Sequence, residues 1–269
     1  MKKSVKFKKL YWFLRKRVPF LFPFRFATGK YRKWYFKRTF LVKKNLEGLK
    51  GGEFTSEFVN HRGRNSQKWS HFLPIYDEVI LEIKKKFCTP ISILEIGVQK
   101  GGSLEIWRSI FGEQAKIFGV DIDPNCATLG LDAEIRIGSS ANKEFLKRVA
   151  NELGTVNLII DDGSHDSKQQ RIALEVLFPY LSENGLYIIE DLEHSYYWSK
   201  HGGYLRNGSI IERGKRLVDD LNKDYFLTPR LRSFKVDTQD VQSITFYQGL
   251  LIIRKSQRTK PSIVIAGLT

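Results

Sequence analysis

The sequence "ISILEIGVQKGGSLEIWRSIF" (residues 91–111) joins a short apolar run to an amphipathic run through a turn that is rich in glycine. The first run predicts a buried strand, and the second predicts a helix that begins near Gly102. Gly97, Gly101 and Gly102 lie where the strand passes into the helix. Glycine there lets the backbone approach a ligand closely, and a helix N-terminus favours negative charge. The spacing differs from the dinucleotide pattern G-x-G-x-x-G, so the turn alone identifies no ligand.

The alternation of strand and helix continues along the chain from this unit. Short apolar strands that alternate with helices predict a doubly wound α/β fold, with a mostly parallel seven-stranded sheet covered by helices on both faces. The last two strands are joined at Gln248-Gly249 as a tight hairpin, which makes one of them antiparallel. The predicted strands are residues 91–97, 116–121, 133–138, 156–161 and 185–190 and two within 242–255, and the predicted helices are residues 74–87, 102–111, 142–153, 167–182 and 209–226.

The excess positive charge of the chain is confined to its N-terminal tract. Of the 45 Lys and Arg residues, 16 lie in residues 1–46 without any acid, which leaves 29 basic and 29 acidic residues in the rest of the chain. Basic residues interleaved with aromatics suit an anionic membrane surface, and the same composition suits single-stranded nucleic acid, a protein contact or a solvated extension. We favour the membrane surface, because the neutral remainder of the chain predicts no basic channel for nucleic acid.

Cysteine usage and hydropathy bound the cellular setting. Cys88 and Cys126 have no metal-type spacing and suit a reducing compartment. The sequence has no run of about 18 uncharged apolar residues, so no membrane-spanning helix is predicted. We therefore expect a cytoplasmic protein, attached peripherally to the inner face of a membrane through its basic tract. The expected divisions are a basic extension (1–50), a helical lead-in segment (51–90), a main domain (91–256) and a C-terminal tail (257–269).

Two pairs of acids follow two of the predicted strands. Asp161 and Asp162 end one apolar strand, and Glu190 and Asp191 end the next. Because neighbouring strands lie about 4.8 Å apart and ligands bind at the carboxyl ends of parallel strands, we expect Asp162, Glu190 and Asp191 to converge. Crowded carboxylates raise one another's pKa, and a hard divalent cation such as Mg²⁺ resolves the crowding. The alternative interpretation is that these acids pair with Lys or Arg, or that Asp161 or Asp162 caps the next helix.

A histidine follows the first acid pair, within "DDGSH". His165 lies on a glycine turn at the expected ligand-binding edge, beside the predicted cation. An imidazole has an ordinary pKa of about 6.5, so it can accept a proton from an attacking hydroxyl near neutral pH. We therefore expect His165 to be a general base, and a purely structural histidine is the alternative.

The motifs "LEIGVQKGGSLEIW" (94–107) and "IFGVDID" (117–123) resemble motifs one and two of class I S-adenosylmethionine-dependent methyltransferases, which have a Rossmann-like fold. The resemblance implies that the motif-one glycines line the cofactor and that Asp121 binds its ribose, with Asp123 as the competitor for that role. It also implies that a serine of "RIGSS" contacts the adenine. The full cofactor-binding set that we expect is Glu95, Gly97, Gly101, Ser103, Asp121, Asp123, Ser139, Ser140 and Asp161.

The acid pairs narrow this resemblance. "IDDGSH" (160–165) followed by "IIEDLEHSYY" (188–197) is similar to the metal-dependent sugar O-methyltransferases of the mycinamicin and macrocin type and to the cephalosporin-hydroxylase-like proteins. The segment "NSQKWSHFLPIY" (65–76) also resembles this family, although Phe72 stands where the family commonly has tyrosine. The metal ligands that the resemblance implies are Asp162, Glu190 and Asp191, and the catalytic base that it implies is His165.

These resemblances imply an enzyme with two cofactors. We expect a Mg²⁺-dependent O-methyltransferase that transfers a methyl group from S-adenosylmethionine to a hydroxyl of a sugar or glycoside, in a surface glycan or a glycosylated natural product. Tyr196, Tyr197 and Trp198 would stack on a sugar face, or form a packed lid without ligand contact. The alternative functions are a catechol-type phenol O-methyltransferase and a non-catalytic protein of this fold that docks on membranes or RNA through its basic tract.

Overall fold

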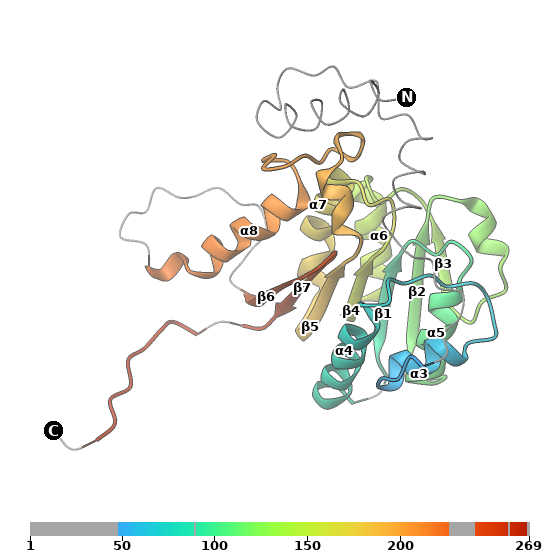
Figure 1. Ribbon diagram of the computed structural model, residues 1–269, viewed down its shortest axis with the longest axis horizontal. Coiled ribbons are helices and arrows are strands. Elements are labelled where there is room, and N and C mark those ends of the chain that lie inside the picture. The colour runs from blue at the N-terminus through green and yellow to red at the C-terminus, as the bar shows by residue number, and fades with distance from the viewer. Residues whose placement is uncertain (1–47, 89, 226–239, 258, 268–269) are drawn as a thin grey trace, which may run out of the picture. The chain divides into compact units, whose positions relative to one another are not determined.

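The computed structural model describes residues 48–88, 90–225, 240–257 and 259–267. Residues 49–269 form one compact unit, and the prediction for residues 1–46 lies outside the described residues. The sheet has seven strands in the order β3-β2-β1-β4-β5-β7-β6 (Figure 1). The strands are β1 (Ser92–Ile96), β2 (Lys116–Asp121), β3 (Glu134–Ile137), β4 (Val156–Asp161), β5 (Leu181–Ile189), β6 (Val241–Tyr247) and β7 (Leu250–Lys255).

The strand directions confirm the predicted mostly parallel sheet. Strands β1 to β5 pair in parallel with one another, whereas β7 pairs antiparallel with both β5 and β6. The hairpin between β6 and β7 turns at Gln248 and at Gly249, whose positive φ of 81° suits glycine. The helices are α3 (Glu53–Asn60), α4 (Leu73–Lys86), α5 (Gly102–Phe111), α6 (Lys143–Leu153), α7 (Ser167–Leu177) and α8 (Ile210–Leu221).

Two apolar layers cover the two faces of the sheet. Alternate residues of a strand point to opposite faces, so Leu158 and Ile160 join one cluster while Ile159 joins the other. The first cluster includes residues of α3, α4 and α5, and the second includes residues of α6, α7 and α8. Figure 1 shows these two sets of helices on either side of the sheet. Burial on both faces explains why the parallel strands read as continuous apolar runs.

The lead-in segment contains a helix that sequence reasoning missed. Helix α3 has only eight residues, and the Asp77 carboxylate of α4 fixes its first turn. Asp77 accepts hydrogen bonds from Gly52 N at 2.8 Å, from Thr55 N at 2.9 Å and from Thr55 Oγ1 at 2.6 Å. Phe54 then stacks on Tyr76 of α4, with ring centroids 4.7 Å apart. The lead-in segment therefore shares its core with the sheet and delivers residues 65–76 to the sheet edge.

The strand order reverses between β1 and β4, and ligands of open α/β sheets bind at the carboxyl ends of the strands at such a point. Gly97 lies there with a φ of 103°, and a Cβ atom on it would lie 2.3 Å from the backbone oxygen of Asp162. Any larger residue would push the β1 turn away from the β4 turn. Glycine at this position therefore brings the predicted cofactor turn against the predicted metal site.

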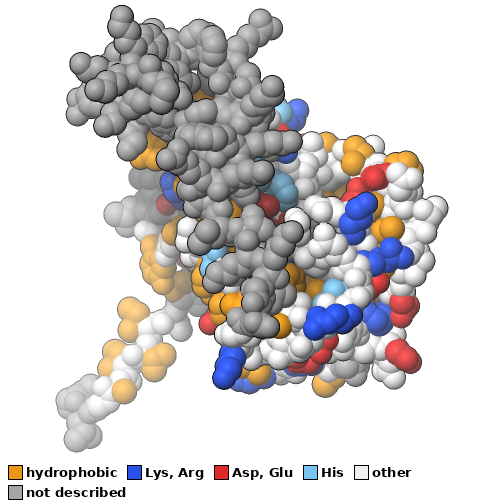
Figure 2. Space-filling model, turned by 45° about the vertical axis from the view of Figure 1, so that its right-hand side comes forward, with side chains coloured by type: hydrophobic (Ala, Val, Ile, Leu, Met, Phe, Trp, Pro, Cys, Tyr) orange, Lys and Arg blue, Asp and Glu red, His pale blue; other side chains and the backbone are white. Residues whose placement is uncertain are grey.

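The surface of the described residues shows mixed charge. On the face in Figure 2, Lys and Arg side chains lie beside Asp and Glu side chains, in agreement with the neutral charge balance beyond residue 46. Residues 259–267 form neither helix nor strand, and Ile263, Val264 and Ile265 are strongly exposed along that tail. Among the described residues, no helix is long and apolar enough to cross a membrane.

Candidate active site

A buried lysine ammonium bridges two of the predicted metal ligands. Asp162 follows β4 and Glu190 follows β5, and Lys68 Nζ lies 2.6 Å from Asp162 Oδ2 and 2.6 Å from Glu190 Oε1. The side chains of Lys68 and Glu190 are each only 2% exposed. The predicted convergence of Asp162 and Glu190 is therefore seen, and the pairing of acids with lysine, which was the alternative, is seen as well.

The third predicted ligand lies beside this pair. Asp191 has a left-handed φ of 55°, and its Oδ1 accepts a hydrogen bond of 2.9 Å from Trp69 Nε1. Glu190 Oε1 accepts a second short hydrogen bond, from the Tyr76 hydroxyl. The lead-in segment thus donates to one oxygen of each of the three carboxylates.

The charges of the site are not balanced by the one ammonium. Burial acts to lower the pKa of Lys68, but the charges of Asp162 and Glu190 outweigh it and raise that pKa far above its ordinary value. Burial and the nearby charge of Asp162 also raise the pKa of Glu190 to about 8. Burial is likewise the first cause of the raised pKa of Asp191, and the charge of His165 opposes it. Glu190 and Asp191 therefore favour one more positive charge beside them, either a proton or a cation.

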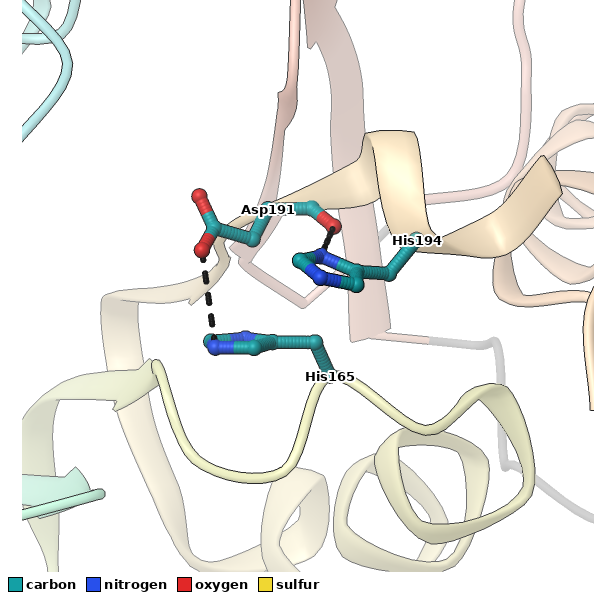
Figure 3. A group of neighbouring side chains, drawn as sticks. All are labelled: His165, Asp191 and His194. Atoms are coloured by element: carbon teal, nitrogen blue, oxygen red, sulfur yellow. Dashed lines mark hydrogen bonds and ion pairs between the residues drawn. The ribbon is translucent and has the colours of Figure 1, made fainter. Parts of the chain in front are cut away.

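His165 faces the outer side of the carboxylates. Its Nε2 lies 3.4 Å from Asp191 Oδ2 and its Nδ1 lies 4.0 Å from Asp162 Oδ1. The backbone of His165 is left-handed, with a φ of 50°. Its ring stacks on His194 with centroids 4.9 Å apart, as Figure 3 shows. His165 Nδ1 is buried without a hydrogen-bond partner among the described residues, so the hydrogen-bonding capacity of this nitrogen is unused there.

A second set of ligand atoms overlaps the predicted one. Single atoms of His165, Asp191 and His194 all lie within 4.8 Å of one another, close enough to hold a metal ion. Figure 3 shows the Asp191 side chain beside the two stacked imidazoles. Asp191 belongs to both sets. Oxygen ligands suit Mg²⁺, whereas imidazole suits transition metals, so the two sets predict different metals.

On the cofactor side, the structure separates the roles of two acids. Asp121 ends β2 and its two oxygens accept hydrogen bonds from Gln99 N at 3.0 Å and from Asp123 N at 2.9 Å. Asp123 instead caps the short helix η2 (Pro124–Thr128) by accepting from Asn125 N at 3.0 Å. Asp121 therefore lies against the glycine turn, where a ribose would bind. Ile122, which sequence reasoning missed, is 71% exposed beside it.

Two predicted cofactor residues contact each other. A carboxylate inside a strand needs polar partners, and Glu95 receives hydrogen bonds from the Ser103 hydroxyl and from Trp107 Nε1, the latter at 2.6 Å. Ser103 is thus fixed to Glu95 in the turn. Farther along, Ser139 Oγ accepts from Ala141 N at 3.2 Å, and Ser140 Oγ lies 3.1 Å from Gln169 Oε1.

Asp161 does not cap the following helix. The N-cap of α7 is Asp166, whose Oδ1 accepts from Lys168 N at 3.0 Å and from Gln169 N at 3.3 Å. The capping alternative for Asp161 or Asp162 was wrong, because the N-cap position of α7 lies five residues after Asp161 and four residues after Asp162. Asp161 is buried at the end of β4, and this burial raises its pKa to about 7. Its Oδ2 has no partner among the described residues.

The aromatic loop after β5 is fixed to the loop that carries His165. Lys200 Nζ donates to the Ser164 carbonyl at 2.6 Å, and His201 Nδ1 lies 2.6 Å from Asp166 Oδ2. The predicted acceptor-binding residues Tyr196 and Trp198 are 48% and 42% exposed. Tyr197 packs edge-on against His194, with centroids 5.3 Å apart. Tyr197 is thus in ring contact with the imidazole pair.

The sequence did not predict Lys68, Trp69 and Tyr76 of the lead-in segment, or His194 after β5, as site residues, although "NSQKWSHFLPIY" resembles the family segment. Phe72, which replaces the expected tyrosine, is fully buried, and the hydroxyl that reaches Glu190 comes from Tyr76 one helical turn later. Residues 72 and 76 are four apart, so they lie on the same face of a helix, and this spacing could have indicated that Tyr76 supplies the hydroxyl.

Comparison with known proteins agrees with this geometry. Residues 94–192 match a family model described as a methyltransferase domain. A tetracenomycin O-methyltransferase of Streptomyces olivaceus, 8-demethyl-8-(2-methoxy-alpha-L-rhamnosyl)-tetracenomycin-C 3'-O-methyltransferase, is 32% identical over 209 residues, which are 72% of this chain and 52% of that protein. Mycinamicin VI 2''-O-methyltransferase of Micromonospora griseorubida is 28% identical over 203 residues, which are 71% of this chain and 50% of that protein.

A solved structure has the same fold. The MycE methyltransferase from the mycinamycin biosynthetic pathway, in complex with Mg and SAH, superposes with a TM-score of 0.66 and 26% identity, over 80% of this chain and 55% of that one. The chain spans about half the length of the curated relatives that it matches. Residues 94–192 therefore match the methyltransferase domain family, and the chain is similar to these O-methyltransferases.

Proposed function

We propose that the chain is an S-adenosylmethionine- and Mg²⁺-dependent O-methyltransferase that acts on a sugar hydroxyl of a glycoside. The observation that carries this proposal is the gathering of Asp162, Glu190 and Asp191 at the ends of β4 and β5, directly beside the Gly97 turn, with His165 facing Asp162 and Asp191. The relatives that are named as O-methyltransferases of rhamnosyl and mycinamicin compounds support the sugar acceptor. S-adenosylmethionine would supply the methyl group.

The residues around the glycine turn fit the cofactor. Gly97 and Gly101 have positive φ values of 103° and 83°, so the turn keeps a backbone surface free of side chains. Asp121 offers carboxylate oxygens for the two ribose hydroxyls at the end of β2. Ile122 presents an exposed apolar side chain next to Asp121, which suits the face of an adenine ring. Glu95 acts on the cofactor through Ser103, whose hydroxyl it holds.

The carboxylates fit a hard divalent cation. The raised pKa values of Glu190 and Asp191 support a site that takes up more positive charge than Lys68 provides. Asp162 Oδ1 and Asp191 Oδ2 face His165, on the side away from the lysine. We therefore propose Asp162, Glu190 and Asp191 as the ligands. A cation there would lower the pKa of an acceptor hydroxyl and orient it.

His165 would accept the proton of the acceptor hydroxyl. Its Nδ1 is without a hydrogen-bond partner among the described residues, and its Nε2 faces Asp191 Oδ2 at 3.4 Å. If the Nε2 proton points at this carboxylate, Nδ1 keeps the lone pair that a general base needs. The ring stack with His194 holds the plane of the imidazole. Tyr197, packed on His194, would place its ring against the acceptor sugar.

The test is a methyl-transfer assay with the full chain against glycosylated natural products, nucleotide sugars and phenols. We expect transfer to a glycoside in Mg²⁺ and loss of transfer in EDTA. Asp162→Ala and Glu190→Ala should lose activity and metal dependence, whereas the exposed Asp132→Ala should keep both. Full activity in EDTA would remove the metal from the proposal. Transfer to phenols alone would establish the catechol-type alternative.

A further inference from the structure

Lys68 is a buried cation inside the proposed metal site. It lies in the turn before α4, 94 residues from Asp162 and 122 residues from Glu190 in the chain. Its ammonium contacts both carboxylates at 2.6 Å, and its side chain is 2% exposed. A lysine is rarely buried to this extent unless it is paired. The proposed mechanism gives Lys68 no step, so its burial needs another explanation.

The hydrogen bonds divide the carboxylate oxygens into two groups. Lys68 takes Asp162 Oδ2 and Glu190 Oε1, and we call these two atoms the inner oxygens. His165 faces the opposite oxygen of Asp162, at 4.0 Å, and one oxygen of Asp191, at 3.4 Å. No hydrogen bond within the described part of the chain reaches Glu190 Oε2. The side of the carboxylates that faces His165 is therefore left open by the lysine.

Neighbouring donors of the same segment repeat this division. Tyr76 donates to Glu190 Oε1, the inner oxygen that Lys68 also contacts. Trp69 donates to Asp191 Oδ1 and leaves Asp191 Oδ2 toward His165. Three donors from residues 68–76 thus each occupy one oxygen of an acid and leave its other oxygen without a bond from this segment. If these contacts served only to neutralise charge, the neutral donors Trp69 and Tyr76 would not be needed beside the charged Lys68.

The charge balance points to the same arrangement. Asp162, Glu190 and Asp191 carry three negative charges when ionised, and Lys68 supplies one positive charge. A divalent cation on the open side would make the sum zero. Burying unbalanced charge is costly, so a site that contains a fixed ammonium is complete with a doubly charged ion.

We propose that Lys68 is a positioning residue of the cation site. It fixes the inner oxygens of Asp162 and Glu190, so that the other oxygen of each carboxylate, Asp162 Oδ1 and Glu190 Oε2, is directed to a divalent ion. This inference rests on the proposed function. Residues that orient metal ligands by hydrogen bonding change metal affinity by about 10- to 100-fold when they are replaced. The opposite arrangement, in which Lys68 occupies the position of the metal and competes with it, predicts tighter metal binding when the lysine is removed.

The experiment measures Mn²⁺ affinity by electron paramagnetic resonance, in the full chain and without turnover. Lys68→Met keeps most of the length of the side chain and removes its charge, and we expect its Mn²⁺ affinity to fall by about 10- to 100-fold. Lys84→Met is the matched control, because Lys84 lies on α4 and forms an exposed ion pair with Glu53 at 2.5 Å. The control should bind Mn²⁺ as the unaltered chain does. S-adenosylhomocysteine affinity, measured by calorimetry, should be kept in both variants.

Chemical rescue separates positioning from general structural support. Lys68→Ala lacks the atoms of a propylammonium ion, so added n-propylammonium should restore part of the Mn²⁺ affinity, and n-propanol should restore none. Tyr76→Phe removes the neutral donor to the same inner oxygen of Glu190 and should weaken Mn²⁺ binding to a smaller extent. It also provides the test if the Lys68 variants do not fold, and an unchanged affinity in Tyr76→Phe would then overturn the inference.

The outcomes distinguish this inference from the function on which it rests. Mn²⁺ binding by Lys68→Met that equals or exceeds that of the unaltered chain would overturn the positioning role and leave the proposed metal site in place. Absence of Mn²⁺ binding by the unaltered chain would overturn both. Equal rescue by n-propanol and n-propylammonium would show that Lys68 fills space and would also overturn the inference.

Discussion

The two residues that face each other across the site share an unusual backbone. His165 and Asp191 both have left-handed conformations, with φ values of 50° and 55°. Non-glycine residues in this region cost about 1 kcal/mol or more, and such strain gathers at functional sites. The strain turns both side chains toward the point where the strand ends meet.

The two stacked histidines should differ in their effect on catalysis. If the carboxylates hold the metal, His165→Ala should lower kcat by about 10²- to 10⁴-fold, the range for loss of a general base. His194→Ala should lower kcat much less, because His194 supports the ring of His165 and binds no metal. Neither substitution should change Mn²⁺ affinity by more than a few-fold.

Metal binding decides between the two ligand sets. Loss of Mn²⁺ binding in His194→Ala would assign the metal to His165, Asp191 and His194. It would also remove His165 from the role of base, because a nitrogen that ligates a metal accepts no proton. Titration of Mg²⁺ against Zn²⁺ and Ni²⁺ is the companion measurement, since imidazole ligands favour the latter two.

Asp161 should make stability depend on pH. Burial raises its pKa to about 7 in the folded chain, above an unfolded value of about 3.9. Folding thus favours the protonated form of Asp161. The contribution of this residue to the free energy of unfolding is therefore complete below pH 4 and is lost as pH rises to about 7. The loss is about 1.4 kcal/mol for each pH unit, up to several kcal/mol.

Asp161→Asn should remove this dependence. The variant keeps the shape of the side chain without its charge, so its stability relative to the unaltered chain should rise between pH 4 and pH 7 and level off above. Urea unfolding at pH 4.5, 6 and 8 measures the difference. A difference that is constant across these pH values would show that Asp161 titrates normally in the folded chain.

The site residues differ in how visible they are in the sequence. Asp162, Glu190 and Asp191 could be predicted because acids at the ends of apolar strands stand out. Lys68 could not, because a lysine that is buried by tertiary structure looks like a surface lysine in the sequence. Its partners lie 94 and 122 residues away, and only the fold brings them together.

At the scale of elements, the loop from β4 to α7 is built around one carboxylate. Asp166 caps α7 through its Oδ1 and meets His201 through its Oδ2. It follows His165 directly, so the cap fixes the chain immediately after the proposed base.

Replacing this cap should weaken helix α7. Asp166→Ala should lower the free energy of unfolding by about 1 kcal/mol, within the usual range of about 0.5–2 kcal/mol for a lost N-cap. Asp166→Asn keeps a side-chain oxygen for the cap and should retain most of that stability. His201→Ala is the control, because His201 is 57% exposed and its ion pair should add little. Urea denaturation of the three variants measures the free energy of unfolding. An equal loss in His201→Ala and Asp166→Ala would contradict a capping role for Asp166.

The accuracy of the predicted boundaries differs among the helices and strands. Helix α5 and strands β2 and β4 begin and end where their apolar patterns do, because glycines or polar residues bound each run. Helix α3 was missed, since eight residues give barely two turns of periodicity and its stability comes from Asp77, which lies outside it. Strand β5 starts at Leu181, earlier than its apolar run, because a register shift against β4 lets Leu181 pair with Val156.

At the scale of the whole molecule, two parts of the chain have different electrostatics. Residues 1–46 hold 16 basic residues and no acid, and the remaining residues hold 29 of each sign. A neutral catalytic unit gains no attraction to an anionic surface from its net charge, so such attraction would depend on the tract. Each Lys or Arg near an anionic membrane adds about 1 kcal/mol of binding free energy, and the effect weakens with salt.

Deletion of residues 1–46 should therefore abolish vesicle binding and leave the active site intact. We expect the full chain to co-sediment with vesicles that contain phosphatidylserine at low salt, and to be released as salt rises. The shortened chain should stay in the supernatant while it binds S-adenosylhomocysteine as tightly as the full chain, because the glycine turn and Asp121 lie in residues 49–269. Vesicles of neutral phosphatidylcholine are the control for apolar binding. Equal sedimentation of both chains would show that the attachment to vesicles lies outside residues 1–46. Release of the full chain from the vesicles by single-stranded RNA, at an equal concentration of charge, would show that the tract does not distinguish RNA from the membrane. That result would contradict the assignment of the tract to a membrane surface.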